Sequence, residues 1–86
     1  MVEFVTRQFL VVKPAHYQLS ELYRPKTLRV TASGVKGDYE YQLVEVTAPK
    51  SREAFNCLGT EIARTADTIL EFLPHGKIDI VKSRRR

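Results

Sequence analysis

The residues of this chain that could do chemistry are few, and their spacing does not favour a reaction centre. Cys57 is the single cysteine, and the two histidines, His16 and His75, stand apart from it in the sequence. No cysteine and histidine have the spacing of metal ligands, so we expect no metal and no cofactor. His75 lies in a Pro-His-Gly turn, which predicts a surface position, and Cys57 fits a small packing residue with no neighbouring base to activate it. We therefore expect a protein that is not an enzyme.

A Gly-x-x-Gly motif at Gly34 and Gly37 invites comparison with phosphate-binding loops. Such a loop needs the N–H groups of a helix that follows it, and residues 39–48 predict a strand instead. KH domains also carry Gly-x-x-Gly, but there the motif joins two helices. The two glycines are therefore interpreted as part of a turn.

Aromatic side chains offer one route to nucleic-acid binding. Tyr39 and Tyr41 share one face of a predicted strand, where exposed rings could stack on the bases of a single strand. The alternative is that both tyrosines cover the core beneath a helix, and this is the interpretation that we favour.

The C-terminal residues offer a second route, because the positive charge of the chain gathers there. The formal net charge is +4, and the last ten residues hold five Lys and Arg against one acid, Asp79. Such a run can attract phosphates. The alternative is a solvated chain end. The candidate phosphate contacts are Lys82, Arg84, Arg85 and Arg86.

The bulk properties predict one small domain, residues 1–82, followed by a basic tail, residues 83–86. Apolar residues make up 43% of the 86 residues, which is ordinary for a globular protein. A chain of this size buries only about 60% of its unfolded surface, so a partner subunit could supply stability. A single cysteine fits a reducing compartment, and no apolar run is long enough to span a membrane. We expect a cytoplasmic protein.

The N-terminal half of the chain, up to residue 48, predicts strands. Residues 2–12 are rich in β-forming side chains, and their alternation changes phase between Phe4 and Phe9, which indicates a bulge or burial on both faces. Residues 27–32 and 39–48 alternate on either side of a glycine-containing turn and predict a hairpin. Residues 14–23 are ambiguous and could form a short helix. A short last strand is expected over residues 76–82.

Residues 51–73 predict one long helix. Apolar side chains recur at steps of three and four, Ser51 suits the N-cap, and Pro74 and Gly76 follow the end. A helix of about 21 residues would be roughly 32 Å long and would organise the whole fold. The apolar residues on this stripe are Phe55, Leu58, Ile62, Ala66, Ile69 and Leu73.

The predicted fold class is therefore α+β: an antiparallel sheet of three to four strands with one long helix packed on one face. Further apolar positions broaden the helix stripe enough to contact both the sheet and a second chain. The predicted partner interface consists of Ala54, Leu58, Ala63 and Leu70.

The order of a hairpin followed by a long helix resembles the small dimerising subunit of the KEOPS complex, which makes threonylcarbamoyl-adenosine in tRNA. The matching residues are Asn-Cys-Leu at 56–58 and Thr-Ile-Leu-Glu-Phe at 68–72, within a span of about residues 28–73. The chain departs from that family in two ways: its predicted helix is longer by about half a turn, and it carries the basic segment 76–86. These departures fit a divergent paralogue of the subunit as well as the subunit itself. The resemblance implies a non-catalytic subunit that forms a homodimer or a heterodimer with a related small subunit, beside a larger catalytic subunit and tRNA.

A second resemblance involves residues 47–52, Thr-Ala-Pro-Lys-Ser-Arg, and residues 76–80, Gly-Lys-Ile-Asp-Ile, which are similar to small phycobilisome linker domains. There the two segments lie closer together, so the predicted helix would be an insertion. The sequence thus leaves two main classes of function: an assembly subunit, or a stand-alone nucleic-acid-binding module, with the linker protein third.

Overall fold

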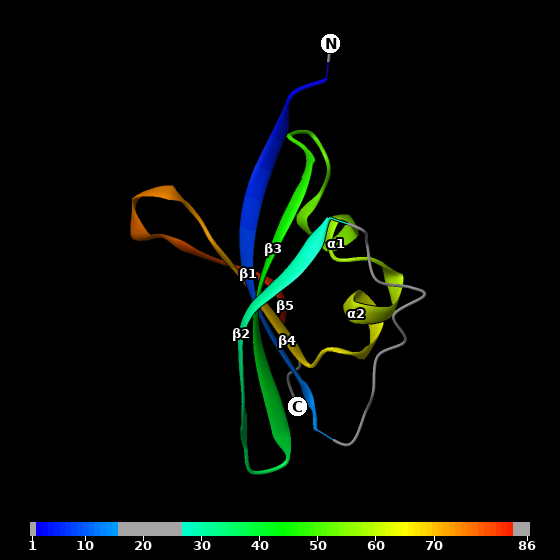
Figure 1. The fold of residues 1–86 in the computed structure, drawn as a ribbon, viewed down its shortest axis with the longest axis vertical. Coiled ribbons are helices and arrows are strands. Elements are labelled where there is room, and N and C mark those ends of the chain that lie inside the picture. The colour runs from blue at the N-terminus through cyan, green and yellow to red at the C-terminus, as the bar shows by residue number, and fades with distance from the viewer. Residues whose placement is uncertain (1, 16–26, 84–86) are drawn as a thin grey trace.

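The fold is built on one antiparallel sheet of five strands in the order β2-β3-β1-β4-β5 (Figure 1). The computed structural model describes residues 2–15 and 27–83. Neighbouring strands in this order are all antiparallel, and β1 lies in the centre. The strands are β1 (Phe4–Pro14), β2 (Leu28–Lys36), β3 (Tyr39–Pro49), β4 (Thr68–Phe72) and β5 (Ile78–Ser83).

Two short helices, α1 (Ala54–Cys57) and α2 (Thr60–Thr65), connect β3 to β4 and lie together on one side of the sheet (Figure 1). A single 3-10 turn, η2 (Pro74–Gly76), connects β4 to β5. The expected α+β fold with one long helix over residues 51–73 is therefore wrong. The described chain is mostly β, with five strands where three to four were expected.

Gly59 explains why the helix breaks. It separates α1 from α2 with a backbone φ of 88°, a conformation that glycine adopts readily and that no right-handed helix contains. Glycine also costs about 1 kcal/mol relative to alanine inside a helix, so the sequence had a weak point at this position. Ala66 then turns to extended backbone and ends α2.

The C-terminal third of the predicted helix is the strand β4. Its first two residues, Thr68 and Ile69, are β-branched and favour a strand. Ile69 and Glu71 are buried, whereas Leu70 and Phe72 are half-buried or exposed, which is a period of two. Ile69 fits a helical stripe as well as a strand, because a short apolar run does not distinguish the two periods.

The first strand and the hairpin are confirmed: β1 is shifted by two residues from the expected range, and the two strands of the hairpin are longer than expected. Most of the predicted turn, residues 33–38, is part of β2, and only Gly37 and Asp38 connect β2 to β3. Gly37 has a φ of 61°, which supplies the backbone conformation that a two-residue hairpin needs. The last strand is also confirmed, over Ile78–Ser83. Most of the ambiguous segment, residues 14–23, lies outside the described residues.

The core lies between the sheet and the two helices. Side chains from β1, β3 and β4 meet side chains from the helices there, and Phe9, Leu58 and Ile69 have no exposed surface. Val30, Ala54 and Val81 pack against the edge of this cluster. The buried core residues are Phe9, Val11, Leu28, Val44, Val46, Ala48, Cys57, Leu58, Ile62, Ala66 and Ile69.

Candidate functional site

The helices cover only one face of the sheet, which we call the covered face; the opposite one is the open face. The pairing register assigns alternate residues of every strand to each face. Phe9 of β1, with Val44 of β3 beside it, belongs to the covered face. The open face consists mainly of Phe4, Thr6, Gln8, Leu10, Val12, Arg29, Ala32, Gly34, Lys36, Tyr39, Tyr41, Leu43, Glu45, Thr47, Leu70, Phe72, Ile78 and Ile80.

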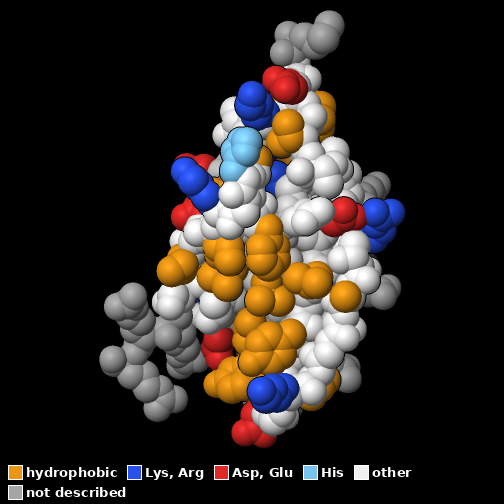
Figure 2. Space-filling model, turned by 90° about the vertical axis from the view of Figure 1, so that its left-hand side faces the viewer, with side chains coloured by type: hydrophobic (Ala, Val, Ile, Leu, Met, Phe, Trp, Pro, Cys, Tyr) orange, Lys and Arg blue, Asp and Glu red, His pale blue; other side chains and the backbone are white. Residues whose placement is uncertain are grey.

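A row of apolar side chains crosses the open face from one edge of the sheet to the other. The register places one residue from each strand in this row, in the order Ala32, Leu43, Leu10, Leu70 and Ile80. We call it the central row. Leu43 is 39% exposed and Ile80 is 61% exposed. Figure 2 shows hydrophobic side chains gathered across the middle of this face.

Aromatic residues flank the central row. Tyr39 and Tyr41 precede Leu43 along β3, and Phe72 follows Leu70 along β4; each is 37–40% exposed. Tyr39 and Tyr41 therefore do not cover the core beneath a helix, and the interpretation that we favoured for them is wrong. Both rings lie on the side of the sheet that faces away from α1 and α2.

The open face is hollowed on the side of β2 and β3. A depression of about 250 Å³ is lined by Leu10, Ala32, Ser33, Gly34, Tyr41 and Leu43. A second depression, of about 410 Å³, adjoins it at Leu43 and extends past Gln8 and Glu45 to Phe72. Small side chains on β2 produce the first hollow, because Ala32 and Gly34 stand opposite the larger Leu43 and Tyr41.

Little charge is present on the open face. Arg29 and Glu45 pair with each other, with 2.6 Å between Nη2 and Oε1, and Lys36 lies at the end of β2. Residues 2–15 and 27–83 together hold nine Lys and Arg and nine Asp and Glu. The excess positive charge therefore belongs to the two segments outside this part of the chain.

Both edge strands carry irregularities that hinder pairing with another sheet. The register shifts in β2 between Val30 and Ala32, and in β5 an extra residue, Val81, lies between the partners of Ile69 and Leu70. Bulges at edges are a device by which proteins prevent edge-to-edge association. The open face is therefore a better candidate for contact than either edge.

The covered face holds the polar cluster of Arg7, Glu71, Cys57 and Arg52. Arg7 donates from Nε and Nη2 to the two carboxylate oxygens of Glu71, both at 2.7 Å, and from Nη1 to the carbonyl oxygen of Arg52 at 2.7 Å. The Glu71 hydrogen bonds raise the pKa of Arg7 above its ordinary value. The buried Cys57 thiol lies 3.6 Å from Nη1. This cluster connects β1 to β4 within the sheet and connects both strands to α1.

A second ion pair joins β1 to β3 near the end of the covered face. The Nζ of Lys13 lies 2.7 Å from Oε1 of Glu40, and the Lys13 side chain is only 5% exposed. Hydrogen bonding to Lys13 lowers the pKa of Glu40 from its ordinary value.

The four residues predicted to form a partner interface do not lie together on the surface. Leu58 and Ala63 are 0% and 1% exposed and contribute to the interior, so their assignment to an interface is corrected. Ala54 packs against the core from α1. Leu70 lies elsewhere, in the central row of the open face.

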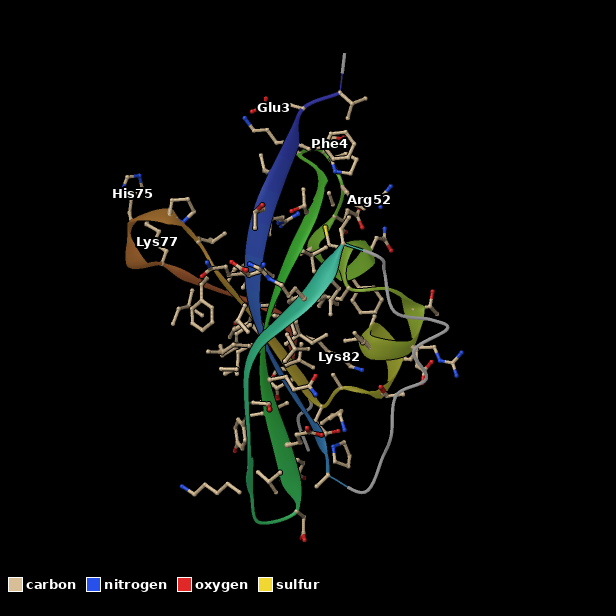
Figure 3. The ribbon with its side chains drawn as sticks, in the orientation of Figure 1. Glu3, Phe4, Arg52, His75, Lys77 and Lys82 are labelled. Atoms are coloured by element: carbon tan, nitrogen blue, oxygen red, sulfur yellow. The ribbon has the colours of Figure 1, made fainter. Side chains whose placement is uncertain are left out.

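Lys82, predicted to contact phosphates, has a structural role. Its ammonium group donates to the carbonyl oxygens of Ala63 and Arg64, at 2.8 and 3.0 Å. It points toward α2 (Figure 3) and supplies positive charge at that helix's C-terminal end, where free carbonyl groups favour a cation. Arg84, Arg85 and Arg86 lie outside the described residues.

The β4–β5 hairpin projects from the sheet on the side opposite the helices, with His75 and Lys77 near its tip (Figure 3). His75 and Gly76 have φ values of 67° and 77°. Two consecutive positive φ values are typical of hairpin turns that match the right-handed twist of their strands. His75 is exposed, as the sequence predicted.

Within residues 2–15 and 27–83, no three side chains of His, Cys, Asp or Glu lie close enough together to hold a metal ion. The helices in these ranges are too short and too polar to cross a bilayer.

The apolar character of the open face was not predicted from the sequence, although the sequence contains a pattern that indicates it. Consecutive apolar pairs occur at Phe9-Leu10, Leu43-Val44, Ile69-Leu70 and Ile80-Val81. In a strand, neighbours point to opposite faces, so each pair contributes an apolar side chain to both. Such pairs are typical of strands that are buried on both faces.

Comparison of the chain with protein-family models, with curated proteins and with solved structures finds no match. The likeness to the KEOPS subunit stays a prediction, and the long helix that carried it does not form.

Proposed function

We propose that this chain is a non-catalytic subunit that joins a larger assembly by docking the open face of its sheet onto another protein chain. The central row supports this most directly. Five apolar side chains cross all five strands, and neither helix of residues 2–15 and 27–83 lies over them, although apolar surface of this extent is usually covered in solution. A face bearing paired charges and apolar side chains fits a protein partner.

This proposal is tested in the protein's own host with two variants, each of which replaces an apolar residue by lysine. Leu43→Lys places a charge in the central row, whereas Val35→Lys places one at a 67% exposed position on β2, away from that row. Tagged wild-type chain and the Val35→Lys variant should migrate in native extracts as part of a larger complex. The Leu43→Lys variant should migrate as the free chain of 9.9 kDa.

Circular dichroism of the purified Leu43→Lys variant serves as the control for folding. A folded Leu43→Lys variant that still migrates with the complex would contradict the proposal. So would a wild-type chain that migrates alone in the native extract.

A second candidate function is binding of single-stranded nucleic acid. The exposed side chains of Tyr39 and Tyr41 lie in line on β3, with Lys36 directly opposite Tyr39, and this arrangement could stack bases. The balanced charge of the described residues favours a protein partner, because nucleic-acid binding draws much of its affinity from an excess of Lys and Arg.

Titration with tRNA at two salt concentrations separates the two candidates. Base stacking on the sheet predicts that Tyr41→Ala weakens binding at both salt concentrations. If Tyr41→Ala leaves tRNA affinity unchanged, the open face does not bind nucleic acid.

A further inference from the structure

We infer that the open face is covered by a second copy of this chain, so that two sheets pack face to face with β5 of one copy over β2 of the other. This inference rests on the proposed function and names the first partner of the same surface. Area, shape, symmetry and charge each contribute to it.

The open face offers a broad apolar area for a second copy to cover. Seven large apolar or aromatic side chains on it are each 37–62% exposed: Phe4, Tyr39, Tyr41, Leu43, Phe72, Ile78 and Ile80. Exposed apolar surface that extends across a whole sheet face is typical of protein–protein contact sites.

The two ends of the open face have complementary shapes. At the β5 end, Ile78 and Ile80 are 57% and 61% exposed, on the hairpin that projects away from the helices (Figure 1). At the β2 end, Ala32 and Gly34 leave the hollow of about 250 Å³. The large side chains of one end match the empty space at the other end, which a single copy cannot bring together because both belong to the same sheet.

Symmetry allows two copies to make this match twice. A two-fold axis that runs parallel to the strands, between the two sheets, places β5 of each copy over β2 of its partner. An axis across the strands would place β5 over β5 and leave both hollows empty. Sheets that pack in this manner lie about 10 Å apart with their strands about 30° from parallel.

Charge does not oppose this arrangement. The strands place only Arg29, Lys36 and Glu45 as charged residues on the open face, and Arg29 already pairs with Glu45 within one copy. The central row that would meet its copy is entirely uncharged.

The test uses the full purified chain without any partner. Sedimentation equilibrium should give twice the chain mass of 9.9 kDa for the wild type and for the Val35→Lys variant, and the single chain mass for Leu43→Lys. A short bis-maleimide then reports the geometry. Cys57 is buried and should not react, so the wild type without added cysteines is the control.

Chains with Ala32→Cys and chains with Ile80→Cys are prepared separately and then mixed. The mixture should yield a cross-linked dimer in much higher amount than either variant alone, because only the mixed dimer places the two thiols opposite each other. Strong cross-linking of Ile80→Cys with itself would overturn the proposed axis. A mass of one chain for the wild type at all concentrations would overturn the dimer.

These failures are distinct from a failure of the proposed function. A wild-type chain that is monomeric when pure but enters a complex in its host through Leu43 would refute the second copy alone. Migration as a free monomer in the host would refute both.

Discussion

Arg7 and Glu71 form a largely buried ion pair between β1 and β4, and its geometry predicts the effect of substitutions. Both nitrogen–oxygen distances are 2.7 Å, and the side chains are 19% and 5% exposed. Removing one partner leaves the other charge buried without its counterpart, which is more harmful than removing both. The guanidinium also lies 5.8 Å from the ring centre of Phe9, which adds a contact to the arginine.

We predict that Arg7→Met lowers the free energy of unfolding by about 3–5 kcal/mol, and that adding Glu71→Leu restores most of the loss. Urea denaturation at neutral pH measures both variants. A double variant as unstable as Arg7→Met alone would show that the arginine acts through its other contacts, such as the one to the carbonyl oxygen of Arg52.

The Lys13–Glu40 pair predicts a dependence of stability on pH. Because hydrogen bonding to Lys13 lowers the pKa of Glu40 below its ordinary 4.5, the native state holds the carboxylate more strongly than the unfolded state does. Its contribution is fully present above that value and is lost as the pH falls through the lowered pKa. Lys13→Met should therefore flatten the fall in stability below pH 4.5, as measured by thermal unfolding across the acid range. A profile as steep as that of the wild type would exclude this pair as the cause.

At the scale of elements, α2 supplies a test of which side faces the sheet. Ile62 is 4% exposed, whereas the Arg64 side chain is exposed to solvent. We predict that Ile62→Ala destabilises the fold by about 2–5 kcal/mol and that Arg64→Ala changes it by less than about 0.5 kcal/mol. Similar losses in chemical denaturation would mean that this side of α2 is assigned wrongly.

The strands were predictable from the sequence and the helix was not, because the two regions differ in how clearly their apolar pattern indicates one structure. Residues 27–32 and 39–48 are two β-forming segments on either side of a glycine-containing turn, a pattern that is typical of a hairpin. Residues 54–72 have apolar positions that fit one long helix, but the positive φ of Gly59 breaks the helix, and the extended backbone of Ala66 ends α2 before the strand β4. The burial of Ile62 was predicted correctly because Ile62 lies in α2, where the chain is helical as expected.

The candidate site was harder to predict than the strands. The order β2-β3-β1-β4-β5 determines which residues share a row, and no local pattern gives that order. Leu70 belonged to the expected interface, but on a helix; the strand β4 places it beside Leu10 instead.

At the scale of the whole molecule, we predict that the basic tail, residues 83–86, can be removed without loss of the fold. Deleting residues 83–86 removes three arginines and one residue of β5, so we predict that stability changes by less than about 0.5 kcal/mol. If the arginines contact phosphates, the deletion should weaken binding to all RNA sequences equally. It should reduce the slope of log affinity against log salt by roughly 0.7 to 0.9 per lost contact. Selective loss for one RNA would contradict a purely electrostatic role.

The proposed dimer predicts that the stability of the chain depends on protein concentration. A second copy that binds only the folded chain stabilises it by mass action, so the midpoint of unfolding must rise with protein concentration. A chain of this size has little core of its own, which makes such a contribution large relative to total stability.

The most direct measurement is the melting temperature of the purified wild-type chain over a hundredfold range of concentration, beside Leu43→Lys. We predict that the wild-type melting temperature rises steadily with concentration. The Leu43→Lys variant should remain folded, melt at a lower temperature and show no dependence on concentration. A wild-type melting temperature that stays constant across the range, together with the mass of a single chain, would contradict the account.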